Sequence, residues 1–279
     1  KALGRRLSEP DRGERGTCRL RLRNASIGGM DLCLDRLDRR DPEFVIDFSH
    51  MHLYDMRAFV EDLTIDGQAI YTTIERLAAR ERSGFELERL SGRFYMTQGC
   101  LGFSDARIVT RESDIRIPYI SLVGNSWEEY RDFIGEVRIE AAIRNSSFSS
   151  DDIACFAPRL RDWHMTFSDA DLELTGTVAD FTGRIRSLTL NDDTHLACDL
   201  ALKGLPEIRD TRFEGTLSDL RSTPDALNRL ALGITGRRLP ESVVSVARNS
   251  GYLDLAARFT GRLTDFDLRL EALTGVGDV

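Results

Sequence analysis

Strict alternation of apolar and polar residues is the feature that most constrains how this chain can fold. Residues 18–23 read CRLRLR, which places leucines on one side of an extended segment and arginines on the other. The same two-residue period recurs in residues 137–144, 171–174, 195–202 and 266–271. Antiparallel strands with one apolar and one wet face show this period, whereas strands of a helix-covered parallel sheet carry continuous apolar runs. We therefore predict a mainly β, antiparallel fold.

Helical signals are few and short. Ser150 precedes DDIACFAP as a possible N-cap, and Thr223 precedes PDALNRL with proline at the first helical position. Leu239-Pro240 begins a similar segment, and NSWEEYRDF after Gly124 could form two turns. Each segment is too short to cover a large sheet, so we expect connectors or plugs.

A degenerate repeat, Gly-x-Val/Leu-x-Asp-Phe/Leu, occurs three times. Its copies are GTVADF at residues 176–181, GTLSDL at 215–220 and GRLTDF at 261–266, and each follows an alternating stretch. Glycine is typical of bulges or bends, and aspartate of turns. Repeated one-sided units that cannot bury their apolar face alone normally stack, so the repeat predicts an elongated structure.

The 279 residues fit one large domain or two ordinary ones. Residues 1–16 are polar and rich in glycine and arginine, and we expect them to form a flexible N-terminal segment. We assign residues 17–279 to the repeating β region, with a possible sub-boundary near 145–150. The chain starts at Lys1 and ends at LTGVGDV without a capping element, so we expect a fragment of a longer protein.

Charge and hydropathy narrow the classes of partner. The formal net charge is −8, which argues against a nucleic-acid partner and weakly against docking on anionic lipid. No apolar run approaches the roughly 20 residues of a membrane-spanning helix. We predict no membrane span in this segment.

Signatures of catalysis and of metal or cofactor binding are weak. His50 and His52 point to one side of an expected strand, but His164 and His195 are distant in sequence. The five cysteines are widely spaced with no CxxC motif, and no GxSxG, GxGxxG or P-loop sequence is present. Acidic pairs such as Asp151-Asp152 are explained by turns and caps. We expect no enzyme activity, no metal and no cofactor.

The apolar faces themselves have two possible arrangements. They could form the core of a β-sandwich, or they could line an open trough that shields acyl chains. Alternation does not distinguish these arrangements, because both use the same alternate residues.

Residues 63–117 resemble the middle region of TamB-type proteins of the AsmA-like superfamily, closest to the versions found in Bacteroidota. The phrase RERSGFELERLSGRF at residues 80–94 carries most of the resemblance, and residues 151–160 and 202–223 are also similar. The resemblance covers most of the chain from about Phe44 onward.

The resemblance implies a curled β-sheet with an apolar groove (a β-taco) in a long periplasmic protein that an N-terminal helix anchors in the inner membrane. It further implies phospholipid transport toward the outer membrane, assistance to outer-membrane protein assembly, and an Omp85-type outer-membrane barrel as partner of the full-length protein. The expected ligands are phospholipid acyl chains.

Apolar residues of the alternating stretches are the predicted groove lining. They are Phe44, Ile46, Phe48, Phe85, Leu87, Phe94, Met96, Ile115, Ile117, Tyr119, Val137, Ile139, Leu172, Leu174, Leu200, Leu202, Phe266, Leu268 and Leu270. The alternative is a periplasmic or surface β-sandwich module that binds glycan or protein and has no lipid role.

Overall fold

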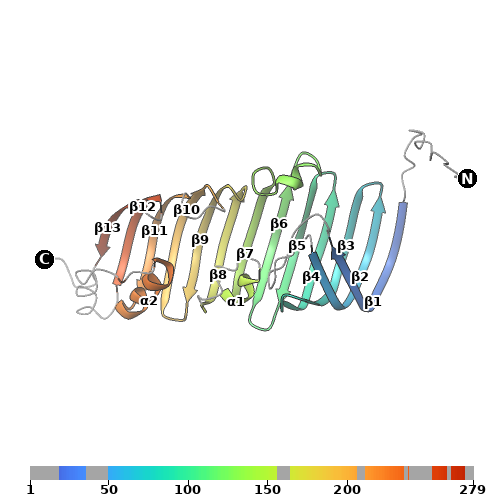
Figure 1. The fold of residues 1–279 in the computed structure, drawn as a ribbon, viewed down its shortest axis with the longest axis horizontal. Coiled ribbons are helices and arrows are strands. Elements are labelled where there is room, and N and C mark those ends of the chain that lie inside the picture. The colour runs from blue at the N-terminus through green and yellow to red at the C-terminus, as the bar shows by residue number, and fades with distance from the viewer. Residues whose placement is uncertain are drawn as a thin grey trace, which may run out of the picture.

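Thirteen strands lie side by side in one antiparallel sheet whose spatial order follows the order of the chain (Figure 1). The computed structural model describes residues 19–35, 50–155, 164–205, 211–235, 238, 253–262 and 265–273. The sheet is elongated and curled, and it does not close, because β1 and β13 each have one neighbouring strand and lie at opposite ends. The predicted mainly β, antiparallel fold is confirmed.

Most strands are long, and tight turns join many of them. The strands are β1 (Arg19–Asp35), β2 (His50–Asp66), β3 (Ala69–Glu81), β4 (Glu86–Thr97), β5 (Cys100–Val109), β6 (Asp114–Val123), β7 (Arg138–Ser149), β8 (Thr166–Gly176), β9 (Asp180–Leu190), β10 (Thr194–Lys203), β11 (Arg212–Ser222), β12 (Leu253–Arg262) and β13 (Asp265–Leu273). The helices are η1 (Glu129–Asp132), a 3-10 turn, α1 (Ser150–Ala154) and α2 (Pro224–Thr235).

The described helices form where the sequence predicts them. The Ser149 side chain, one residue before the predicted cap, accepts a hydrogen bond from the Asp151 amide at the start of α1. Pro224 is the first residue of α2, and the Thr223 hydroxyl oxygen accepts a hydrogen bond from the Ala226 amide. The segment after Leu239 and residues 1–16 lie outside the described residues.

Two of the three repeat copies occupy equivalent places in the sheet. Gly176 pairs with Phe181 across the β8–β9 turn, and Gly261 pairs with Phe266 across the β12–β13 turn. The copy at residues 215–220 lies inside β11 instead, where Gly215 pairs with Leu200. The repeat therefore marks a hairpin turn in its first and third copies and lies inside a strand in its second copy.

Bulges interrupt the alternation inside many strands. Asp105, Asn145 and Asp169 have positive φ angles within β5, β7 and β8, and the pairing register shifts beside them. A bulge adds one residue to a strand and bends it. As a result, Ile143 and Phe148 contact the same apolar cluster although they are five positions apart, an odd spacing that would place them on opposite faces of a regular strand.

The one buried apolar cluster among the described residues lies over β7–β10. Met165, Ala170, Leu188 and Leu190 form its centre, and Leu230 of α2 packs against it. No second sheet faces the first within the described part of the chain, so the β-sandwich arrangement is wrong. The sheet also runs through residues 145–150, because β7 pairs with both β6 and β8.

Polar contacts fix the β5–β6 turn to α1. The Thr110 hydroxyl donates a 2.5 Å hydrogen bond to Asp152 Oδ2, and the Ser113 hydroxyl donates to the same oxygen. The Ser113 oxygen also accepts the Ser149 amide. These contacts hold the start of α1 against the end of the sheet.

Candidate functional site

An unbroken row of apolar positions crosses the whole sheet. Residues directly opposite each other on paired antiparallel strands share a face, so the register can be followed from strand to strand. One row contains Leu20, Ile65, Ile70, Met96, Leu101, Leu122, Ile139, Gly176, Phe181, Leu202, Phe213, Gly261 and Phe266. No charged residue interrupts this row, which we call the apolar row, on any of the thirteen strands.

Two further rows run beside the apolar row on the same face. The next row follows Phe94, Phe103, Ile120, Ala141, Leu174, Gly183, Leu200, Gly215, Phe259 and Leu268. A third row follows Ile143, Leu172, Ile185, Cys198, Leu217, Ala257 and Leu270. Together the three rows make a continuous apolar face.

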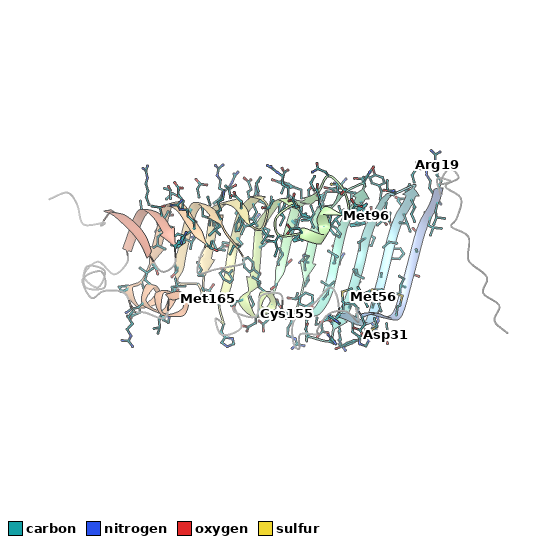
Figure 2. All side chains as sticks on the ribbon, turned by 45° about the horizontal axis from the view of Figure 1, so that its top comes forward. Arg19, Asp31, Met56, Met96, Cys155 and Met165 are labelled. Carbon is teal, nitrogen blue, oxygen red and sulfur yellow. The ribbon has the colours of Figure 1, made fainter. Side chains whose placement is uncertain are left out.

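This apolar face is partly open to solvent. Most of its residues in β2–β6 are half-buried, and Leu20, Leu22 and Leu34 of β1 are exposed. Figure 2 shows Met96 and Arg19 near one long border of the sheet, and Asp31, Met56, Cys155 and Met165 near the other. Large exposed apolar patches are typical of surfaces that bind proteins, membranes or apolar ligands.

The opposite, hydrophilic face carries ladders of ion pairs. Arg107 Nε and Nη2 each donate a 2.7 Å hydrogen bond to the Asp114 carboxylate. These hydrogen bonds lower the pKa of Asp114 and raise that of Arg107. Glu173 accepts hydrogen bonds from Arg144 and Arg186, of which the Arg144 bond contributes most to its lowered pKa. The two faces therefore differ sharply in chemistry.

Two hollows lie on the hydrophilic face. The larger, of about 830 Å³, is lined by Glu173, Thr182, Arg184, Asp199 and Arg258, among others. A smaller hollow of about 390 Å³ is lined by Asp62, Tyr71, Thr73, Arg93, Tyr95 and Ser104, together with Thr72 and Phe94. Arg184 pairs with Glu173 and Asp199, whereas its neighbour Gly183 pairs with Leu174 and Leu200 of the apolar face. The larger hollow is therefore lined mainly by residues of the hydrophilic face, with Gly183, Leu200 and Gly215 of the second row also in its lining.

The strand pairing places most of the predicted lining residues on the apolar face. Met96, Ile139, Leu202 and the position of Phe266 belong to the apolar row. Phe94, Leu174, Leu200, Leu172 and the positions of Leu268 and Leu270 belong to the two rows beside it. Farther along the strands, Leu87 pairs with Ala79, Ile115 with Ile108 and Ile117 with Ala106.

The other predicted lining residues lie elsewhere. Val137 is fully buried just before β7, and Phe85 is half-buried in the turn between β3 and β4. Phe44, Ile46 and Phe48 lie outside the described residues.

Tyr119 lies on the opposite face from Phe94 and Met96. It pairs with Ser104 and Ala142, while its neighbour Ile120 pairs with Phe103 and Ala141 on the apolar face. Neighbouring residues of a strand point to opposite faces, and Tyr119 is 46% exposed. The alternation of Ile115, Ile117 and Tyr119 breaks at Pro118, opposite the bulge at Asp105, so the placement of Tyr119 with the lining is wrong.

Several face residues were missed because sequence reasoning sampled only the clearest stretches. The missed members include Leu101, Phe103, Ile120, Leu122, Phe181 and Phe213. All of them obey the two-residue period within their strands, so the signal was present. Extending the period from each turn would have found them.

The residues considered for metal or catalytic chemistry do not converge. His50 is buried with its Nε2 3.5 Å from Asp35 Oδ1, and the His52 ring contacts Tyr54 edge-on. Within the described part of the chain, no group of three His, Cys, Asp or Glu residues could hold a metal ion. His164 pairs with Asp151 at 3.1 Å on the surface. Among the described residues, Cys33, Cys100, Cys155 and Cys198 form no disulfide.

Comparison with protein-family models, curated proteins and solved structures gave no match for this chain. Among the described residues, no helix has the length and hydropathy needed to cross a membrane. The apolar face is therefore the feature from which function must be inferred.

Proposed function

We propose that this chain is a segment of an envelope-biogenesis protein whose apolar face conducts phospholipid between two membranes. The observation that carries the proposal is the apolar row, which continues over thirteen strands without a charged residue and without an opposing sheet among the described residues. A surface of this kind can keep acyl chains away from water.

The free energy of transfer supports acyl chains as ligands. Each methylene group withdrawn from water contributes roughly 0.8 kcal/mol. Thirteen strands at a spacing of about 4.8 Å give a row of about 58 Å. One leaflet of a bilayer's hydrocarbon core is only about 15 Å thick. A single lipid therefore covers part of the row and can move along it.

The side chains of the apolar row favour movement of a bound lipid along the row over its retention at one position. Its members are similar aliphatic and aromatic side chains with two glycines, so neighbouring positions offer similar binding free energy. Charged head groups would stay in water at the border of the sheet, because burying an unpaired charge is costly. The arrangement requires no bond to be made or broken.

The resemblance to TamB-type proteins supports the cellular setting of the proposal. We infer that the full-length protein resides in the periplasm and is anchored in the inner membrane. An Omp85-type outer-membrane barrel is the corresponding partner, and assistance to outer-membrane protein assembly is the related activity.

Two substitutions at adjacent positions on opposite faces test the proposal. Phe181 belongs to the apolar row, whereas Thr182 is exposed on the hydrophilic face. The chain is expressed in a bacterial periplasm and purified without detergent, and bound phospholipid is measured by native mass spectrometry and lipid extraction. We expect Phe181→Asp to reduce bound phospholipid about tenfold or more, because the acyl chain would lie against a carboxylate.

The matched control is Thr182→Asp, which adds the same charge on the same strand and should retain the lipid. Wild-type protein that purifies without phospholipid would contradict the proposal. Equal lipid on the Phe181→Asp and wild-type proteins would contradict it too.

Binding of a glycan or a protein at the hydrophilic face is the second candidate. The hollow of about 830 Å³ favours it, because guanidinium, carboxylate and hydroxyl groups line the hollow over β8–β12. Retention of a polysaccharide or protein that is lost in Thr182→Asp and kept in Phe181→Asp would support this candidate.

A further inference from the structure

The smaller hollow of the hydrophilic face combines aromatic rings with hydrogen-bonding groups. Its volume of about 390 Å³ lies within the range of sites for small ligands. The lining of the larger hollow contains no aromatic side chain, so the two hollows differ in chemistry. The aromatic and polar side chains that β2–β5 contribute to the smaller hollow are those of Asp62, Tyr71, Thr73, Arg93, Tyr95 and Ser104.

Two tyrosines stand side by side in this hollow. Tyr71 of β3 pairs directly with Tyr95 of β4. The Cβ atoms of such a pair lie about 4.5–5.5 Å apart, so the two side chains are neighbours. Tyr71 is 46% exposed and Tyr95 is half-buried. The hollow therefore offers two adjacent aromatic side chains to a ligand.

A glycine on the next strand makes room for the Tyr95 ring. Gly102 of β5 pairs with Tyr95, and a Cβ atom added to Gly102 would lie 2.5 Å from Tyr95 Oη and 2.7 Å from its Cζ. The tip of the ring thus lies over Gly102, in the space that a larger residue would fill. A ring held in one place loses little conformational freedom when a ligand binds, which favours affinity.

Charged and hydroxyl groups complete the lining around the tyrosines. Asp62 is exposed and has a φ of 50° at a bulge, where the register of β2 with β3 shifts. Its carboxylate can accept hydrogen bonds from hydroxyl groups. Arg93 pairs with Asp105 through one nitrogen, and its guanidinium has further N–H donors. The Thr73 and Ser104 hydroxyl groups can both donate and accept.

A carbohydrate has both kinds of surface that this lining suits. The C–H groups on one side of a pyranose ring form an apolar surface that can pack on a tyrosine, and its hydroxyl groups donate and accept hydrogen bonds. An acyl chain would instead displace water from Asp62 and Arg93 without replacing its hydrogen bonds. The acidic Asp62 and Asp105 disfavour the phosphates of a nucleic acid. The chemistry of the hollow therefore fits a carbohydrate best.

We propose that the smaller hollow binds a neutral carbohydrate chain, with sugar rings packed on Tyr71 and Tyr95 and sugar hydroxyl groups bonded to Asp62 and Arg93. The site lies on the opposite face from the apolar row, because Tyr71 and Tyr95 alternate with Ile70 and Met96 of that row. Carbohydrate binding here is an activity additional to lipid transport.

Calorimetric titration of the purified, delipidated chain tests the site. The ligands are maltohexaose, cellohexaose and N-acetylchitohexaose, and we expect at least one of them to bind with a millimolar or lower Kd. Tyr71→Ala should weaken this binding about tenfold or more, because it removes one of the two rings. Tyr71→Phe keeps the ring and should change the Kd less than about threefold.

The matched control is Tyr119→Ala. Tyr119 is also 46% exposed on the hydrophilic face, but it does not line the hollow, so the Kd should change less than about threefold. Circular dichroism confirms that each variant is folded. Failure of all three oligosaccharides to bind, or equal losses in Tyr71→Ala and Tyr119→Ala, would overturn the proposal.

The larger hollow provides a further discriminating result. Binding that is lost in Thr182→Asp and kept in Tyr71→Ala would place the carbohydrate in the larger hollow and would also overturn the proposal. All these measurements concern the hydrophilic face of delipidated protein, so their failure leaves the proposed lipid function untouched.

Discussion

Along β1, five apolar side chains remain 39–47% exposed, whereas Met165, Leu188 and Leu190 beneath α2 are each 7% exposed. Both regions belong to one sheet and show the same two-residue period. What differs is the cover, because α2 follows β11 and brings Leu230 onto the cluster over β7–β10. Side chains of β7–β10 and Leu230 of α2 thus close this part of the face, whereas the face of β1 stays open.

The comparison shows that alternation fixes which side of a strand is apolar but not whether that side is filled. Closed parts of the face form a buried cluster, and open parts leave apolar side chains exposed to solvent. In this molecule the closed part lies in the middle of the sheet, and the open part extends toward β1 (Figure 1).

The largest expected effect is a difference in the free energy of unfolding between substitutions in the buried cluster and substitutions in β1. Leu190→Ala should lower the free energy of unfolding by about 2–5 kcal/mol, because it removes buried methyl groups and leaves a cavity. Leu32→Ala, in the open region, should cost less than about 1 kcal/mol, because Leu32 is 41% exposed. Urea denaturation of both variants provides the measurement. Equal losses would mean that both regions are packed alike.

Thiol reactivity offers a second way to compare the closed part of the apolar face with the open part. Burial raises the pKa of the Cys198 thiol from 9.0 to about 11, a change that lowers the thiolate fraction about 100-fold at neutral pH. Iodoacetamide should therefore modify exposed Cys33 at least 100-fold faster than Cys198, and the rate at Cys198 should rise with pH up to about 11. Mass spectrometry of the alkylated peptides measures both rates, and urea should abolish the difference. Rapid modification of native Cys198 would show that this part of the face is open.

The smallest expected effect concerns the hydrophilic face of the open region. Hydrogen bonds from Arg107 lower the pKa of Asp114 in the folded protein. The ion pair therefore contributes its full stabilisation above about pH 3.9, the ordinary pKa of an unfolded aspartate. This contribution is lost as the pH falls through the lower pKa of the folded state. Both side chains are at least one-third exposed, so Asp114→Asn should cost less than about 1 kcal/mol at pH 7. Urea denaturation at pH 7 and at pH 2 gives the free energy of unfolding of the variant and of wild type. If the two proteins differ more in this free energy at pH 2 than at pH 7, this account is contradicted.

Strand identity and most apolar faces could be predicted from sequence because alternation is a local property. Met96, Leu174 and Leu202 needed no knowledge of distant residues to be placed on the apolar face. Tyr119 was misplaced because Pro118 and the bulge at Asp105 shift the phase of the pattern, and such shifts depend on the neighbouring strands. The position of α2 over Leu188 and Leu190 depends on tertiary packing, which the sequence pattern does not encode.

The strictly consecutive strand order has a consequence for evolution. Each strand of the described sheet pairs with the strands immediately before and after it in the sequence, so duplication of one hairpin would lengthen the sheet without rearranging the remainder. Each duplicated hairpin would add two strands, or about 10 Å, to the span. A change in the number of hairpins alone could thus change the length of the sheet.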